Sequence, residues 1–131
     1  MSLIKKSTEL NIPTNVKMML YGQAGFGKST VALSAPMPLL LDFDNGVKRV
    51  NDSHLQSVDI VQVTSWNDMK VLMSENLSAY QSIVIDTIGK MMDFIISYKC
   101  GTRQPSIRDW GGINQESVSY THLRAHETLA N

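Results

Sequence analysis

Cysteine is almost absent from this chain, with Cys100 as the only one among 131 residues. A single cysteine excludes an intramolecular disulfide and indicates a reducing compartment such as the cytoplasm. Because the sequence offers no group that would activate the thiol, we expect Cys100 to be a packing residue at a helix end.

An excess of charge is missing as well, since twelve Lys and Arg residues balance twelve Asp and Glu residues. The overall charge therefore points neither to nucleic acid nor to a membrane, and a contact with DNA would need a local patch or an assembly. No apolar run approaches the roughly 18 residues of a membrane-spanning helix. Residues 1–16 contain lysines but no apolar core, so we expect no secretory signal there.

Apolar residues make up 43% of the chain, which is enough to form a hydrophobic core. The length suits one domain and is too short for two ordinary ones. Residues 1–15 mix Ser, Thr, Asn and Lys with one proline, so we expect a flexible N-terminal arm followed by the domain from residue 16.

The segment from Gly22 to Ser29 fits G-x-x-x-x-G-K-[ST], the phosphate-binding P-loop. The apolar residues 16–21 before it have the length of a strand, and residues 30–33 after it predict a first helical turn. Strand, glycine loop and helix is the context in which this motif binds phosphate. These flanks disfavour the alternative of a glycine-rich turn with an exposed lysine.

Each position of the motif has a chemical reason. Glycines let the main chain approach a phosphate, and successive N–H groups can form an anion-binding nest. Lys28 would place its charge on the β- and γ-phosphates of ATP, and Ser29 would offer its hydroxyl to Mg²⁺. The predicted nucleotide-binding residues are Gly22, Gln23, Ala24, Gly25, Phe26, Gly27, Lys28, Ser29 and Thr30.

Three further segments have strand character. Residues 39–44 and 82–86 are continuous apolar runs that end in acids, which is typical of parallel strands covered on both faces. Residues 58–63 alternate and are rich in β-branched side chains, which indicates a strand nearer an edge.

Helices are expected between these strands. Ser65 and Asp68 form a capping-box pattern. Thr87 begins a helix whose Met- and Ile-rich face is expected to be core, with Gly101 as its stop. Residues 103–112 are polar and glycine-rich, and predict a loop. The expected helices are residues 30–34, 47–50, 65–76 and 87–100.

Alternating strands and helices predict an α/β domain with a mostly parallel sheet flanked by helices. The carboxyl ends of its strands would share one edge, where Gly22, Asp44 and Asp86 would meet.

Acids at these strand ends are the candidate metal and catalytic groups. Asp86 could hold Mg²⁺ with Ser29, and its alternative role is a helix N-cap. Either Asp42 or Asp44 could orient or deprotonate an attacking water, but both could equally be turn formers ahead of Asn45-Gly46. The residues alone leave that choice open.

The segment from Met19 to about Gln115 resembles the bacteriophage-type AAA-domain ATPases, a RecA-like group of P-loop nucleotide-binding proteins. The resemblance rests on the motifs Leu20-Tyr21-Gly22, Ser34-Ala35-Pro36, Leu41-Asp42-Phe43-Asp44-Asn45-Gly46 and Ile83-Val84-Ile85-Asp86-Thr87. It implies a RecA-like sheet, binding of ATP with Mg²⁺, and a role in phage DNA recombination, annealing or replication in the host cytoplasm. In RecA-like enzymes an acid after the second strand acts on the attacking water. The family pattern usually has Glu there, so Asp44 is the candidate base, one methylene shorter.

Residues 117–131 break the pattern and resemble a translated sequencing adapter. Under this interpretation His122 and His126 are not a metal pair, and Arg124 is not an arginine finger. We then expect residues 16–116 to be the N-terminal portion of a longer ATPase. Its sheet would be incomplete, with unpaired edges and exposed apolar faces.

Three functions are compatible with these residues. The leading one is Mg²⁺-dependent ATP hydrolysis coupled to work on single-stranded DNA, in which a homo-oligomer could supply a basic residue in trans. The second is a DNA-binding or assembly module that binds ATP with little turnover. The third is a small-molecule kinase with an arginine-bearing lid, a context that Arg103 and Arg108 lack.

Overall fold

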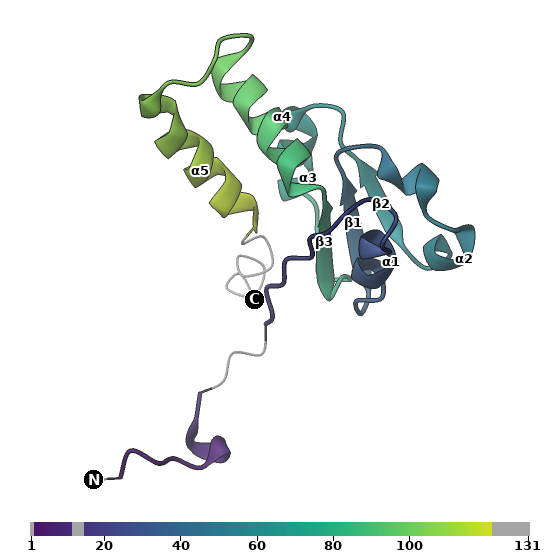
Figure 1. Ribbon diagram of the computed structural model, residues 1–131, viewed down its shortest axis with the longest axis vertical. Coiled ribbons are helices and arrows are strands. Elements are labelled where there is room, and N and C mark those ends of the chain that lie inside the picture. Colours follow the sequence, from purple (N-terminus) through teal and green to yellow (C-terminus); the bar gives the residue numbers. More distant parts are fainter. Residues whose placement is uncertain (1, 12–14, 122–131) are drawn as a thin grey trace.

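The computed structural model describes residues 2–11 and 15–121, which fold into a small parallel sheet with helices around it (Figure 1). The N-terminal arm extends away from the sheet and carries one short 3-10 helix. In chain order the elements are η1 (Ser7–Glu9), α1 (Lys28–Leu33), β1 (Pro38–Asp42), η2 (Gly46–Arg49), α2 (Asp52–Leu55), β2 (Asp59–Gln62), α3 (Trp66–Met73), β3 (Ser82–Asp86), α4 (Ile88–Cys100) and α5 (Ile107–Thr121).

The sheet has the strand order β2-β1-β3, and both pairings are parallel. Leu39 of β1 lies opposite Asp59 of β2 and Ile83 of β3. The central strand β1 is buried along its whole length, as its continuous apolar sequence predicts, whereas β2 is largely exposed. The expected α/β class with a parallel sheet is therefore confirmed. Residues 82–86 form a strand as expected, but β3 is only half-buried because it borders a single neighbour among the described residues.

The strand expected at residues 16–21 is not formed. This segment runs into the glycine loop as an extended trace without strand pairing (Figure 1). Its apolar side chains are exposed, between 40% for Leu20 and 90% for Tyr21. A strand exists only where it shares backbone hydrogen bonds with a neighbour, and this segment pairs with neither outer edge of the described sheet β2-β1-β3. Apolar sequence alone could not reveal that missing pairing.

The hydrophobic core lies where β1 meets α3 and α4. Phe43, just after β1, stacks on Trp66 at a centroid distance of 6.3 Å and contacts Phe94 at 5.7 Å. α3 begins with the expected Ser65–Asp68 capping box, and α4 runs from its Thr87 cap to Gly101 as predicted. The Met-rich face of α4 is core, and the half-buried Cys100 packs against it from the helix end. The buried members of this core are Leu39, Leu41, Phe43, Val63, Trp66, Met69, Leu72, Leu77, Met91, Ile95 and Ile113.

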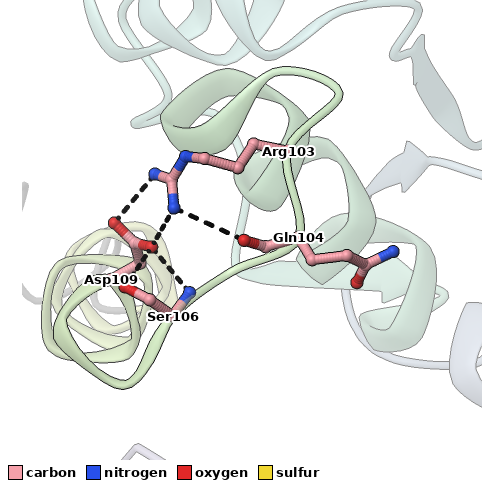
Figure 2. Close-up of polar contacts among 4 residues, drawn as sticks. All are labelled: Arg103, Gln104, Ser106 and Asp109. Atoms are coloured by element: carbon pink, nitrogen blue, oxygen red, sulfur yellow. Dashed lines mark hydrogen bonds and ion pairs between the residues drawn. The ribbon is translucent and has the colours of Figure 1, made fainter.

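The prediction of a loop at residues 103–112 is wrong from residue 107 onward, because α5 begins at Ile107. The connection before it is fixed by a polar cluster shown in Figure 2. The two terminal guanidinium nitrogens of Arg103, Nη1 and Nη2, donate to the carboxylate of Asp109 at 2.8 and 3.2 Å. The same carboxylate accepts from the Ser106 backbone N–H at 2.7 Å, which satisfies an open donor at the helix start. This local cap makes a helix of a sequence whose glycine content indicates a loop.

α5 packs beside α4, on the side of α4 that faces away from the sheet (Figure 1). Ile113 is fully buried in the core, and the Trp66 indole N–H donates to Glu116 Oε1 at 2.9 Å. Lys99 lies 3.6 Å from the other oxygen of Glu116. α5 is therefore part of the same hydrophobic core as the sheet. Within the described residues no helix is long and apolar enough to cross a membrane.

Candidate functional site

The glycine loop connects the extended segment to α1 and is exposed to solvent. Gly25 and Gly27 have φ angles of 85° and 81°, in the left-handed region that favours glycine. Gln23, Ala24 and Phe26 lie in the exposed turn between the glycines, and Thr30 is half-buried in α1. The expected helix after the loop is present, beginning at Lys28 and ending at Leu33.

Lys28 folds back over the loop that precedes it. Its ammonium group donates to the carbonyl oxygens of Gly22 and Gln23, both at 2.7 Å. The cation is thereby held at the loop by main-chain acceptors. A phosphate placed there would meet a positive charge already positioned, which is the arrangement expected for a lysine that binds phosphate.

Ser29 and Asp86 come together from distant parts of the chain. The Ser29 hydroxyl donates to Asp86 Oδ2 at 2.7 Å, and Asp86 is the last residue of β3. The N-cap of α4 is Thr87, whose hydroxyl accepts from the Lys90 N–H at 3.3 Å. The alternative role of Asp86 as that cap is therefore not what the structure shows. Its carboxylate faces the glycine loop instead.

Asp42 and Asp44, which the sequence could not distinguish, have different surroundings. Asp42 is 2% exposed and accepts the N–H groups of Gly46 and Val47, at 3.0 and 3.3 Å. It is therefore the turn former of the pair. Asp44 forms no such turn bonds with any described residue. It lies beyond the strand, directly after Phe43, whose N–H donates to the Asp86 carbonyl at 2.8 Å.

The Asp44 carboxylate is partly enclosed. Its side chain is 22% exposed, and Oδ2 lies 3.6 Å from the guanidinium of Arg49. Among the described residues its Oδ1 has no hydrogen-bond partner, and this oxygen is buried. A buried carboxylate oxygen without a hydrogen bond carries a desolvation cost, and the nearby positive charge of Arg49 offsets part of it.

The donor set fits a magnesium ion better than a softer metal. Mg²⁺ prefers oxygen ligands and retains several waters, so one hydroxyl and one carboxylate suffice for a protein site shared with phosphate. Ser29 and Asp86 supply that pair within hydrogen-bonding distance of each other. Across residues 2–11 and 15–121, no three His, Cys, Asp or Glu side chains gather as a further metal site. His122, Arg124 and His126 lie outside the described residues.

Two features of the site were missed by sequence reasoning. One is Arg49, whose place five residues after Asp44 across a short turn was the available signal. The other is Gly46, which was interpreted only as a turn residue although it lies against the Asp44 carboxylate. Both depend on the conformation of η2, and that conformation is set by the buried carboxylate of Asp42.

Comparison with known proteins gives one result. A model of the AAA domain family matches residues 14–126, which is most of the chain. Neither the curated proteins nor the solved structures contain a significant match. AAA domains generally bind ATP, usually with Mg²⁺, so the match supports nucleotide binding. The matched region contains the glycine loop, Asp44 and Asp86, and all the strands described above. The chain belongs to the AAA domain family.

Proposed function

We propose that this protein binds Mg·ATP between the glycine loop and Asp86 and hydrolyses it. The observation that carries this proposal is the 2.7 Å hydrogen bond from Ser29 to Asp86. It joins the P-loop hydroxyl to an acid at the carboxyl end of a parallel strand, where ligands of α/β sheets bind. The nine residues from Gly22 to Thr30 would surround the phosphates.

Each residue has a defined part in this reaction. Lys28 exchanges its two carbonyl partners for phosphate oxygens and neutralises their charge. Ser29 and Asp86 would hold Mg²⁺, which supplies further positive charge beside the phosphates when bound. Asp44 accepts a proton from water as the water oxygen bonds to the γ-phosphorus. The bond from that phosphorus to the bridging oxygen breaks, and ADP and inorganic phosphate leave.

We further propose that this turnover is coupled to work on single-stranded DNA, in phage-type recombination, annealing or replication. The support is the resemblance of the glycine loop and the strand-end acids to that group of proteins. The chain has no net charge, so DNA would be bound by a local patch or by a homo-oligomer. Such an oligomer could also supply a basic residue to the site in trans. Residues 16–116 would be the ATPase core, and residues 117–131 a non-native extension.

A second candidate is an ATP-binding module with little turnover. The surroundings of Asp44 favour it, because one carboxylate oxygen is buried and the other faces Arg49. Arg49 then competes with a water molecule for that second oxygen. The kinase alternative is weaker, since Arg103 is engaged by Asp109 and lies in the connection between α4 and α5.

ATP binding and phosphate release, measured with and without single-stranded DNA, test these functions. We expect wild-type protein to bind ATP in the presence of Mg²⁺ and to release phosphate faster with DNA. Lys28→Ala should abolish binding, and Asp44→Asn should keep binding but lower turnover at least about 100-fold. ATP binding with negligible turnover and ATP-dependent DNA binding would favour the module. Absence of ATP binding by the wild type would exclude both.

A further inference from the structure

We propose that Gly46 is a positioning residue that sets where the carboxylate of Asp44 lies. Asp44 follows β1, and Gly46 opens η2 two residues later. A Cβ atom built on Gly46 would lie 2.6 Å from Asp44 Oδ1, closer than real Cβ contacts. The space that a side chain would take at Gly46 is therefore occupied by this carboxylate oxygen.

Glycine is needed here for space and not for backbone conformation. Gly46 is not among the glycines with positive φ, so alanine could adopt its backbone angles. Oδ1 is buried and has no hydrogen-bond partner among the described residues, so the open space at Gly46 is what accommodates it. Absence of a side chain is thus what lets the oxygen stay in this position.

The backbone of Gly46 cannot retreat to make room. Its N–H donates to the buried carboxylate of Asp42 at 3.0 Å, and the residue itself is buried. A methyl group at Gly46 would also lie 3.1 Å from Arg49 Nη2, so the space is limited on that side as well. The Asp44 side chain, which is 22% exposed, is the group that can give way.

The size of the displacement follows from the contact distance. Ordinary contact begins at 3.4 Å, so Oδ1 must move about 0.8 Å from a methyl at 2.6 Å. A misplacement of about 1 Å in a catalytic group can lower a rate about 100-fold. Gly46→Ala should therefore act on turnover and leave the phosphate loop unchanged. The catalytic part of this inference rests on the proposed function, and the displacement itself does not.

Gly46→Ala is tested against Gly111→Ala in the full chain. Gly111 lies in α5, where an added Cβ meets no atom within 4 Å, so the control introduces the same methyl without a collision. Crystal structures of both variants should show the Asp44 carboxylate moved by about 0.8 Å in Gly46→Ala and unmoved in Gly111→Ala. An unmoved carboxylate in Gly46→Ala overturns the inference, whether or not the protein hydrolyses ATP.

Kinetic measurements then test whether the displacement of the Asp44 carboxylate lowers turnover. We expect Gly46→Ala to lower kcat about 10- to 100-fold while the Kd for ATP stays within about twofold of wild type. In the Asp44→Asn background the same substitution should cause no further loss, because both changes act through one group. Equal additional losses in the two backgrounds overturn the positioning role. If wild-type protein binds ATP without hydrolysing it, the proposed function fails and the crystal structures alone decide whether Gly46 positions Asp44.

Discussion

Asp42 and Asp44 are separated by a single residue, and yet their carboxylates have different surroundings. Asp42 accepts two backbone N–H groups and is enclosed by the turn that it stabilises. Asp44 has one oxygen without a hydrogen bond in the described part of the chain, and a 3.6 Å ion pair with an arginine that is itself 75% exposed. A pair whose cation is this exposed contributes little to the stability of the fold.

Removal of the Asp42 carboxylate should destabilise the protein. In Asp42→Ala the buried N–H group of Gly46 and the part-buried N–H group of Val47 lose their acceptor, and an unsatisfied buried donor costs about 1–3 kcal/mol. Urea unfolding measures this loss, with Asp93→Ala as control, because the exposed Asp93 only forms a 3.9 Å pair with Lys90. A loss no larger than that of the control would contradict the structural role.

At this scale the sequence predicts which side chains lie close together but not which role each of them has. The P-loop pattern and the acid that ends β3 predict that Ser29 and Asp86 lie close together, and the structure has them hydrogen-bonded. The choice between Asp42 and Asp44 depends on the angles of the turn, which composition does not encode. The angles of the same turn bring Arg49 and Gly46 beside the Asp44 carboxylate, so these contacts could not be predicted either.

At the scale of elements, α4 and α5 differ in how well the spacing of their apolar residues predicts a helix. α4 carries a clear apolar face with a Thr87 cap and a Gly101 stop, so its sequence predicts it almost to the residue. α5 contains adjacent glycines, Gly111 and Gly112, and one dominant core side chain, which give a weak helical pattern. Tertiary packing and a good cap override that weak local preference.

The contribution of that core side chain can be measured. Ile113 is 0% exposed and Ile107, in the first turn of the same helix, is 93% exposed. Ile113→Ala should lower the free energy of unfolding by about 2–5 kcal/mol through lost burial and the cavity left behind. Ile107→Ala should change it by less than about 0.5 kcal/mol. Similar effects of the two substitutions in denaturant unfolding would mean that α5 does not pack on the core as described.

Acid should weaken the start of α5 selectively. The hydrogen bond from Arg103, and then the N–H of Ser106, lower the pKa of Asp109 well below its ordinary value. The stabilisation is complete above the unfolded pKa of about 4 and is lost as the pH falls toward the folded pKa. Stability measured between about pH 5 and pH 2 should therefore fall more steeply in wild type than in Asp109→Asn. Parallel profiles would show that Asp109 does not contribute to acid unfolding.

At the scale of the whole molecule, the sheet is small and its β3 edge has no strand partner in the described part of the chain. The exposed apolar residues 16–21 lie next in sequence to the glycine loop. An open strand edge together with an exposed apolar segment favours association with other chains. We therefore expect self-association of this protein at high concentration.

A charge placed in that segment should suppress the association. Met19→Lys replaces an exposed side chain that forms no part of the core, so thermal stability should change little. Light scattering at rising concentration should show smaller particles than for wild type. Val71→Lys, at an exposed position of α3, is the matched control and should leave the particle size unchanged. An equal decrease in both variants would mean that net charge, and not the segment, governs association.

The bond between Trp66 and Glu116 has a spectroscopic consequence. The chain has two tryptophans, of which Trp66 is 2% exposed and Trp110, on α5, is 41% exposed. A soluble quencher such as acrylamide should therefore reach one indole and spare the other. Because the Trp66 N–H is bonded to α5 through Glu116, detachment of that helix would open the protected indole to the quencher. Fluorescence without any added label thus reports whether α5 is docked on the core.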